Sequence, residues 1–516
     1  MVGQSRVWVI AAFALYLVLM IIIGAKYINS KSSEDYFLGS RGLNKWVAAF
    51  SSQASDMSGW LLMGLPGAIY LSGIGQIWIA IGLFIGTVFN WVFISPRLRR
   101  YTIRAGNALT LPEYFSNRFH DKSKRILFIS SVITVIFFLV YTASALSAGG
   151  KLFNIVFGID YKIALFIGAF VILAYTFMGG FMDVCVTDFI QGMLMLLCLM
   201  AVPIIALFLV GGFGSVPNLL DASSIPYGTD SFLNIFNSDG SDIGIIGIIS
   251  QLGWGLGYCG MPHILTRFMA VKSERELKKS RVIAIIWVII SLSFACLIGV
   301  VGRAYLLPKV LGSTGSSSEN VFIEMITKMF TQDINIPFIG GLFLCGILAG
   351  IMSTADSQLL VTSSSVSEDF YRGIINKNSS EKHVLFISRL TVLAVAVLAF
   401  FIALNPDNSI MGLVSIAWAG LGSAFGPVVL LSLFWKRSNI NGAVAGMISG
   451  GATVLVWEYI PFINGQTLGK ATGLYSLVIG FVIGIVSIVV FNLATKAPDD
   501  EVLREFSDVL ENKNIE

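Results

Sequence analysis

Residues 46–72 have the sequence WVAAFSSQASDMSGWLLMGLPGAIYLS, an apolar run with six polar residues between positions 51 and 58. The run is long enough to span a bilayer, yet a lone Asp at the centre of a membrane helix costs about 2.5 to 3.5 kcal/mol on insertion scales. Polar segments at bilayer depth are tolerated where they face protein or a water-filled cavity. We therefore predict a membrane helix that is interrupted near Asp56 and faces the protein interior.

A second apolar run is interrupted in a similar way. Residues 243–266 contain GWGLGYCGMP at positions 253–262, with four glycines and one proline. Glycine costs backbone entropy in a helix and proline removes a donor, so a regular helix is disfavoured here. In one Gly-rich span, close helix packing would be the simpler explanation. Two such breaks, one of them containing Asp56, favour a binding site.

The composition excludes most other protein classes. Of the 516 residues, 55% are hydrophobic and 12% are charged, whereas soluble domains carry about 25% charge. Disordered, collagen-like and disulfide-rich proteins are excluded by the same numbers. The five cysteines lie within apolar segments without a Cys-x-x-Cys spacing, which is typical of small membrane-core residues. The chain is therefore predicted to be a polytopic helical membrane protein.

The charges and histidines exclude further functions. The net charge is only +4, and the Lys and Arg residues lie in short loops, which indicates membrane topology instead of nucleic-acid binding. His120, His263 and His383 are scattered, and no nucleophile is paired with a base by its spacing. We therefore expect neither an enzyme nor a cofactor site. No obligate protein partner is evident, and the lipid bilayer is the surrounding that the composition implies.

Thirteen apolar runs are long enough to be membrane helices, each of which needs about 20 residues. They are approximately 7–25, 46–72, 77–95, 126–150, 163–179, 189–212, 243–266, 282–306, 338–366, 384–404, 410–434, 442–460 and 472–494. Spans two to six and spans seven to eleven form two groups of five, and each group begins with its broken helix. This is the layout of an inverted-repeat secondary transporter, whose binding site lies at mid-membrane between the two breaks.

The basic residues predict the orientation. One set of alternate loops holds 24 Lys and Arg, and the opposite set, with the N-terminal stub, holds 7. Those seven are Arg6, Lys151, Lys162, Arg303, Lys309, Lys328 and Lys470. Because the richer side should be cytoplasmic, we place the N-terminus outside and the C-terminus inside the plasma membrane. Residues 213–242, with four Asp and no Lys or Arg, agree with an extracellular position.

Motifs spread over nearly the whole chain resemble the solute:sodium symporter family, and within it the bacterial sodium/proline symporters. They are DYFLG at 35–39, SDMSGWLLMGLPGA at 55–68, GGF at 179–181 followed by Thr187 and Asp188, GY at 257–258 with PHIL at 262–265, MST at 352–354, and AWAGLG at 417–422 with FGP at 425–427. The resemblance implies an all-α fold of the LeuT type with about 13 transmembrane helices. Two inverted repeats of five helices would follow one extra helix and precede two more.

The same resemblance implies a division of the chain. It comprises 1–45 for the N-terminal extra helix and a cytoplasmic loop, 46–212 for the first repeat, 213–242 for an extracellular loop, 243–434 for the second repeat, 435–494 for the two C-terminal extra helices, and 495–516 for a cytoplasmic tail. The tail is acidic and polar, and we expect a short helix with a frayed end.

The resemblance further implies a sodium site between the first broken helix and the eighth repeat helix. Sodium prefers about five or six oxygens, commonly carbonyls and hydroxyls. The implied ligands are the carbonyls of Ala54, Met57 and Gly350 and the hydroxyls of Ser353 and Thr354. Without the resemblance, these two hydroxyls would be expected to bond to their own helix. Asp56 could cap the half-helix that begins at Ser58, could support sodium without ligating it, or could do both.

The implied solute contacts come from both breaks and the fourth span. They are Ser58, Gly59, Trp60, Tyr141, Trp254 and Tyr258. Amides at a break suit a carboxylate, and aromatic faces suit a pyrrolidine ring with its ammonium. Cys259 and Met261 stand where the family often has Phe and Gln, which predicts a roomier pocket.

Some family members have a second cation site at the position of Asp188, with hydroxyls from the helix of Ser353 and Ser357. Here Asp356 precedes Ser357. Two carboxylates could therefore approach each other and share a proton, or one could be solvated at the cytoplasmic mouth, which we expect.

These features predict a sodium symporter that imports L-proline by alternating access, with Na⁺ as the coupling ion. The alternative is a symporter of the same family for another small amino acid or organic acid. A potential of ~100 mV and a tenfold sodium gradient contribute about 2.3 and about 1.4 kcal/mol, so one ion could support roughly 500-fold accumulation.

Overall fold

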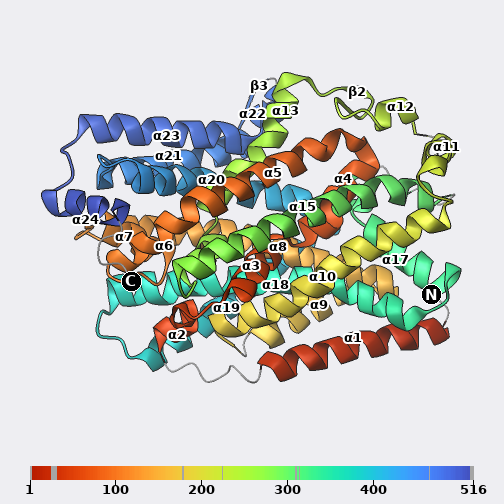
Figure 1. Cartoon of the computed structure of the whole chain (residues 1–516), viewed down its shortest axis with the longest axis horizontal. Helices are drawn as coiled ribbons and strands as arrows, with labels where there is room; N and C mark the ends of the chain where they lie inside the picture. Colours follow the sequence, from red (N-terminus) through yellow and green to blue (C-terminus); the bar gives the residue numbers. More distant parts are fainter. Residues whose placement is uncertain are drawn as a thin grey trace.

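The structure is a computed structural model that describes residues 3–24, 32–176, 179–223, 225–307, 311–312, 314–463 and 465–511. Lys26, Lys31 and Lys309, which contribute to the predicted orientation, lie outside the described residues, as do positions 177–178 of the fifth predicted span and 512–516 of the tail. Helices run side by side along the long axis of the molecule (Figure 1). The predicted all-α class is confirmed.

Ten helices among the described residues are long and apolar enough to cross a membrane. They are α1 (Gly3–Gly24), η4 (Ile74–Gln76) continuing through α5 (Ile77–Phe89), η5 (Asn90–Ile94) and α6 (Ser95–Arg104), α8 (Arg125–Phe157), α10 (Phe181–Leu209), α15 (Glu274–Tyr305), α18 (Pro337–Ser364) continuing into η9 (Ser365–Ile375), α19 (Glu381–Ala403), α20 (Ile410–Phe434), α21 (Ile440–Tyr459) and α23 (Ser476–Ala494). Each of the ten overlaps a predicted span.

The other three predicted spans are broken or short. The second span is α3 (Lys45–Asp56), η3 (Trp60–Gly64) and α4 (Leu65–Ser72), the fifth is α9 (Tyr161–Thr176), and the seventh is α13 (Gly244–Leu252), η7 (Gly253–Gly260) and α14 (Pro262–Met269). Both interruptions therefore lie where the polar and Gly-rich stretches predict them. The total of thirteen crossings and the division of the chain into repeats stay predictions.

Short elements connect the long helices. They are α2 (Ser33–Leu38), η2 (Gly39–Arg41), α7 (Leu111–Arg118), η6 (Phe213–Ser215), α11 (Val216–Ala222), α12 (Thr229–Phe232), α16 (Gly315–Ser318), α17 (Val321–Lys328), η8 (Met329–Asp333), α22 (Leu468–Thr472) and α24 (Asp500–Leu510). Two antiparallel hairpins pair β1 (Asn237–Ser238) with β2 (Ser241–Asp242) and β3 (Pro461–Ile463) with β4 (Gln466–Thr467).

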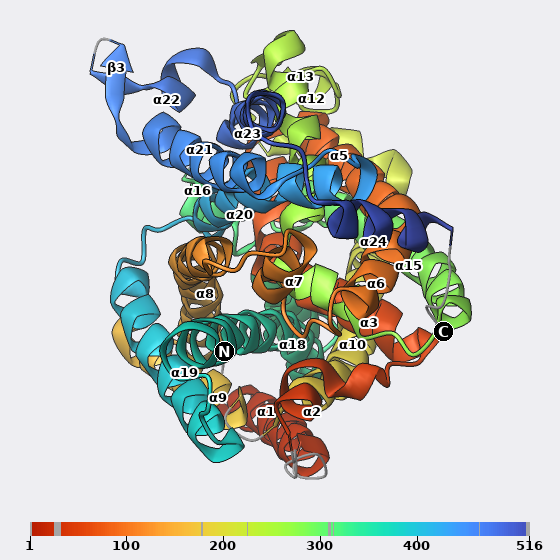
Figure 2. The ribbon, with the colours of Figure 1, turned by 90° about the vertical axis from the view of Figure 1, so that its left-hand side faces the viewer.

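The helices form an inner group and an outer group. In the view along the bundle, α3, α8, α18 and α20 lie near the centre, whereas α1, α19, α21 and α23 lie toward the periphery (Figure 2). The exposure agrees, because 78% of the apolar windows of α18 and α20 is buried, compared with 33% in α1, α19 and α23. The polar serines and threonines of α18 are therefore interior residues, as a binding site requires.

The two ends of the bundle carry different connections. The start of α1 lies at the same end as α11 and α12, and α24 lies at the opposite end with α6 and α7 (Figure 1). Helix α24 is held there by an ion pair between Arg104 and Asp508 at 2.9 Å and by a contact of 3.1 Å between His120 Nε2 and Glu505. The start of α1 and helix α24 therefore lie at opposite ends of the bundle. Which face is cytoplasmic stays a prediction from the basic residues.

Candidate functional site

The first break follows from the loss of helical geometry at Met57. Its φ and ψ are −86° and 77°, and α3 ends at Asp56. The chain returns to a helix through the π-helical turn η3, whose amide at Leu61 donates to the Ser58 carbonyl at 3.0 Å. The Ser58 amide already donates to the Asp56 carbonyl at 3.0 Å. The break therefore frees backbone groups inside the bundle, which is where a transporter places its binding site.

The second break is a tight 3₁₀ segment followed by one extended residue. Met261 has φ −85° and ψ 105°, and Pro262 starts α14 at a position where its missing amide hydrogen costs nothing. On one side η7 packs on α5 so closely that a Cβ at Gly255 would lie 2.1 Å from the Gly82 carbonyl oxygen. A Cβ at Gly86 would lie 2.2 Å from the Gly255 oxygen. Glycine is thus required for this contact between backbones.

Four of the five predicted sodium ligands are brought together. The Ser353 hydroxyl donates to the Ala54 carbonyl at 2.8 Å and to the Gly350 carbonyl at 3.2 Å, and Thr354 Oγ1 lies 3.4 Å from the same Ala54 oxygen. All four residues are buried. Met57 is also buried, but its described hydrogen bonds are from its own amide to the Gln53 carbonyl at 2.8 Å and from Ser291 Oγ to its sulfur at 3.3 Å. Its carbonyl therefore stays a predicted ligand.

Asp56 connects the two breaks. The Tyr258 hydroxyl donates to Asp56 Oδ2 at 2.6 Å, and Trp60 Nε1 donates to the Asp56 carbonyl at 2.9 Å. Asp56 is 1% exposed, and its Oδ1 has no hydrogen-bond partner among the described residues. The carboxylate therefore bonds to a side chain of the second broken helix and not to the amides that the capping interpretation requires. Asp56 thus links the segment of the predicted sodium ligands to the segment of the predicted solute residues.

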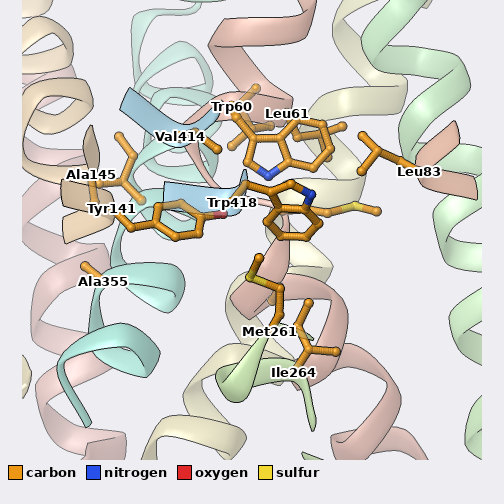
Figure 3. Close-up of a cluster of buried hydrophobic side chains, with 14 of the residues drawn as sticks. Trp60, Leu61, Leu83, Tyr141, Ala145, Met261, Ile264, Ala355, Val414 and Trp418 are labelled. Carbon is orange, nitrogen blue, oxygen red and sulfur yellow. The ribbon is translucent and has the colours of Figure 1, made fainter. Parts of the chain in front are cut away.

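The predicted solute residues form a buried aromatic group. Tyr141 and Tyr258 are 0% and 1% exposed, and the Tyr141 hydroxyl, which has no hydrogen-bond partner among the described residues, points toward Trp418 (Figure 3). Gly59 packs against α8, because a Cβ there would lie 3.0 Å from Ala148 Cβ. Trp254 lies farther out and is 7% exposed, with its ring stacked on Tyr475 at a centroid distance of 5.1 Å. The Trp254 ring therefore faces Tyr475, and only its backbone carbonyl points toward the aromatic group, where it accepts a hydrogen bond from Trp418.

The two positions from which a roomier pocket is predicted, Cys259 and Met261, have different surroundings. Cys259 lines a cavity of 340 Å³ at the surface of the bundle, together with Gly82, Leu256 and Phe481. The 3₁₀ geometry of η7 points successive side chains to different sides, so Tyr258 reaches Asp56 while Cys259 faces this outer cavity. Met261 is fully buried and lies near Trp418 (Figure 3). Only Met261 stays a candidate for shaping the solute site.

An arginine bonds to two oxygens of the predicted second cation site. Arg267 Nη2 lies 3.1 Å from Asp188 Oδ2 and 2.5 Å from Ser357 Oγ, and all three side chains are fully buried. Ser51 Oγ also donates to Asp188 Oδ2, at 2.7 Å. A guanidinium thus supplies a positive charge at the place where the family resemblance allows a second cation. A buried pair of this kind is stable only while both partners are present.

Asp356 is separate from this pair. Thr176 Oγ1 donates to Asp356 Oδ1, and Oδ2 has no hydrogen-bond partner among the described residues. Both Asp188 and Asp356 are 0% exposed. The expectation that one carboxylate is solvated at the cytoplasmic mouth is therefore wrong in this conformation, because the helices close over both.

Comparison with known proteins identifies the scaffold. The model of the sodium:solute symporter family matches residues 36–450. The chain belongs to the sodium:solute symporter family. It is 43% identical to the sodium/proline symporter of Escherichia coli strain K12, over 97% of this chain and 95% of the relative. It is also 43% identical to the high-affinity proline transporter PutP of Bacillus subtilis strain 168, over 95% of this chain and 98% of the relative.

Solved structures support the same fold. A substrate-bound, outward-open Na⁺-coupled sialic acid symporter superposes with a TM-score of 0.75 at 20% identity, covering 95% of this chain and 99% of that one. A closed nucleobase-cation-symport-1 family transporter gives 0.52 at 11% identity, covering 95% and 97%. The predicted LeuT-type symporter fold is thereby confirmed, and this family member is a multi-pass membrane protein. The relatives are transporters, in agreement with the prediction that the chain is not an enzyme.

Three residues of the candidate site were not predicted from the sequence. Arg267 is one of the 24 basic residues from which the orientation is predicted and which were expected in loops, but it lies inside α14 and is fully buried. Trp418 was recorded only as part of a motif, and Asn90 not at all. Asn90 Nδ2 donates to the Tyr258 carbonyl at 3.0 Å from the start of the π-helical turn η5. The sequence signal that could have identified Asn90 is a polar amide side chain within an otherwise apolar span.

The predicted extracellular side of the site is closed by a buried ion pair. Lys151 Nζ on α8 lies 2.9 Å from Glu319 Oε2, and the two side chains are 6% and 2% exposed. Glu319 also accepts hydrogen bonds from the amides of Ile410 and Met411 at the start of α20, at 3.0 and 2.9 Å. A Cβ at Gly67 of α4 would lie 2.7 Å from the Glu319 backbone. The Glu319 carboxylate thus joins α8 to α20, and the Glu319 backbone packs on α4.

We expect Lys151→Met to reduce uptake at least tenfold. A hydrogen bond to a charged group contributes about 1.5 to 3 kcal/mol, and the substitution removes it from the state that is closed outside. Initial rates of sodium-driven uptake measure the effect. The double variant Lys151→Met/Glu319→Gln should regain part of the loss, and Lys162→Met, which removes an exposed lysine, serves as the control. Equal rates for Lys151→Met and Lys162→Met would contradict the role of the pair.

Proposed function

We propose that this family member is a sodium-coupled symporter that imports L-proline across the plasma membrane by alternating access. The observation that carries the proposal is the set of buried oxygens between α3 and α18. Hydroxyls of Ser353 and Thr354 meet the carbonyl that Ala54 presents near the first break. A sodium ion would replace the hydrogen bond from Ser353 by drawing the same oxygens around itself, as hard cations prefer oxygen ligands.

The solute is proposed from the neighbouring groups and from the relatives. The half-helix that starts after Ser58 directs its positive end at the site, which favours a carboxylate. Tyr141, Tyr258 and Trp60 offer aromatic faces to an apolar ring and its ammonium. The relatives at 43% identity are named sodium/proline symporters, and one is named an osmoregulated proline transporter. These facts support L-proline over another small amino acid or organic acid.

The link between Asp56 and Tyr258 suggests how the ion and the solute act on each other. Sodium near Ala54 adds positive charge next to the Asp56 carboxylate, and Asp56 holds Tyr258 of the solute segment at 2.6 Å. Occupation of the sodium site therefore orients a residue of the proposed solute site before the solute enters. The bonds of Arg267 to Asp188 Oδ2 and Ser357 Oγ support coupling to one sodium ion.

The test is uptake into proteoliposomes loaded with potassium buffer. An inward sodium gradient should drive accumulation of labelled L-proline, and a potassium gradient of the same size should not. Competition by a panel of amino and organic acids separates proline from the alternative solutes. Sodium-independent uptake, or the absence of proline uptake by protein that binds another solute, would contradict the proposal.

The double variant Ser353→Ala/Thr354→Val tests the proposed ion site. It removes two hydroxyls from the oxygen cluster without removing a carbonyl, and we expect the apparent sodium affinity to fall at least tenfold because hydrogen-bonding or ligating groups contribute about 1.5 kcal/mol or more each. Ser363→Ala on the same helix is the matched control, since within the described part of the chain its buried hydroxyl bonds to the Leu360 carbonyl of its own helix alone, at 2.9 Å. A sodium response equal to that of the control would exclude the two hydroxyls from the ion site.

A further inference from the structure

Trp418 lies within the group of proposed solute residues although it belongs to neither broken helix. It is 1% exposed on α20, and its ring is perpendicular to that of Tyr258 at a centroid distance of 5.2 Å. The indole lies next to that of Trp60, and the Tyr141 hydroxyl points toward it (Figure 3). A solute that enters between the broken helices must therefore lie against this indole or displace it.

Two contacts with η7 set the position of the indole. Its Nε1 donates to the Trp254 carbonyl at 2.8 Å, which satisfies a backbone group within the 3₁₀ segment. Its edge lies over Gly257, where a Cβ would be 2.0 Å from Nε1 and 2.4 Å from Cε2. Any residue other than glycine at position 257 would have to push the indole away. The hydrogen bond fixes the indole of Trp418, and the lack of a side chain at Gly257 leaves the space that the indole occupies.

We propose that Trp418 determines the size of the solute that the site accepts, with the Trp254 carbonyl and Gly257 holding its indole in position. This inference rests on the proposed function, because it assigns Trp418 to the solute site of a symporter for small amino or imino acids. The indole is a large, rigid side wall supplied by α20, whereas Tyr141 and Tyr258 supply hydroxyls. One methylene in an apolar pocket changes discrimination by about 10- to 200-fold, so a fixed wall can separate close homologues.

The experiment compares L-proline with L-pipecolate, whose ring is one methylene larger, in proteoliposomes. Wild-type protein should take up proline at least tenfold more efficiently, measured as kcat/KM. Trp418→Phe shortens the wall and removes the Nε1 donor, so the ratio of pipecolate to proline efficiency should rise at least tenfold. The sodium concentration for half-maximal proline uptake should change less than twofold, because no sodium ligand is altered.

A second variant approaches the same contact from η7. Gly257→Ala leaves Trp418 unchanged but forces the indole toward the site, so the efficiency for pipecolate should fall more than that for proline. Trp91→Phe is the matched control, because Trp91 is equally buried and packs on Phe268 at a centroid distance of 4.6 Å outside the site. Size-exclusion profiles establish that each variant is folded.

The outcomes separate a selective role from simple packing. Opposite shifts of the ratio in Trp418→Phe and Gly257→Ala, with no shift in Trp91→Phe, would support the proposal. A uniform loss of uptake for both solutes in Trp418→Phe, with the ratio unchanged, would overturn it. If wild-type protein transports neither solute, the proposed function fails, and the same variants are then compared by binding of the panel solute that competes best and of its homologue one methylene larger.

Discussion

An Asp56→Asn variant is expected to need roughly 30-fold more sodium for half-maximal uptake than the wild type. Asn keeps an oxygen that can accept from Tyr258, so the substitution removes the charge and little else. If the sodium ion lies about 7 Å from the Asp56 carboxylate, their attraction at an effective dielectric constant of about 20 stabilises the bound ion by about 2 kcal/mol. This energy corresponds to the expected factor. Sodium titrations of proline uptake at saturating proline measure the change.

Tyr258→Phe is the control for Asp56→Asn. It removes the hydroxyl that donates to Asp56 Oδ2 at 2.6 Å but leaves the carboxylate in place. We expect it to weaken proline affinity more than sodium affinity, the reverse of Asp56→Asn. If Asp56→Asn shows an unchanged sodium response, Asp56 has no part in ion coupling.

The second large effect is expected for Arg267→Met. Removing one partner of a buried ion pair costs about 3 to 5 kcal/mol, because the other charge stays buried without compensation. The variant should therefore lose most of its thermal stability margin and nearly all uptake. Replacing both partners, in Arg267→Met/Asp188→Asn, should restore much of the stability, since neutral groups of similar size tolerate burial.

Sodium should also distinguish the single from the double variant. In Arg267→Met the oxygens of Asp188, Ser51 and Ser357 lose the guanidinium that now joins them. A metal cation can then occupy that place, so high sodium should raise the melting temperature of the single variant and have little effect on the double variant. The control is Arg99→Met, which removes an arginine that bonds to the Val271 and Lys272 carbonyls and to no carboxylate among the described residues. Equal stability of Arg267→Met and Arg99→Met, with or without sodium, would contradict this role.

The general plan of the molecule was accessible from the sequence because the membrane leaves few alternatives. Long apolar runs must be helices, and the polar residues up to Asp56 and the glycines from 253 to 260 cannot lie in a lipid-facing helix. The structure places both breaks at these residues. The meeting of Ala54 with Ser353 was predicted by the family resemblance and not by the spacing of the residues, because 299 positions separate them in the chain.

The remaining site residues could not be predicted for physical reasons. An arginine that follows an apolar run resembles a topology signal, and only the tertiary contact with Asp188 explains the burial of Arg267. Trp418 occurs in an apolar helix where aromatic residues normally serve packing. The family resemblance placed Cys259 at the solute pocket, whereas in the 3₁₀ segment η7 it lines an outer cavity. Each of these differences concerns where a side chain points, which depends on partners far away in the sequence.

The close contact of α5 with η7 has a consequence for motion. The helix from Ile74 to Arg104 is continuous, and it meets η7 at Gly82 and Gly86 without intervening side chains. Farther along, its Arg99 holds the Val271 and Lys272 carbonyls just beyond α14. The same helix therefore contacts both halves of the second broken helix, one on each side of Met261. We therefore expect that Met261 does not act as a free hinge while these contacts are in place, and that the two halves of the broken helix move together.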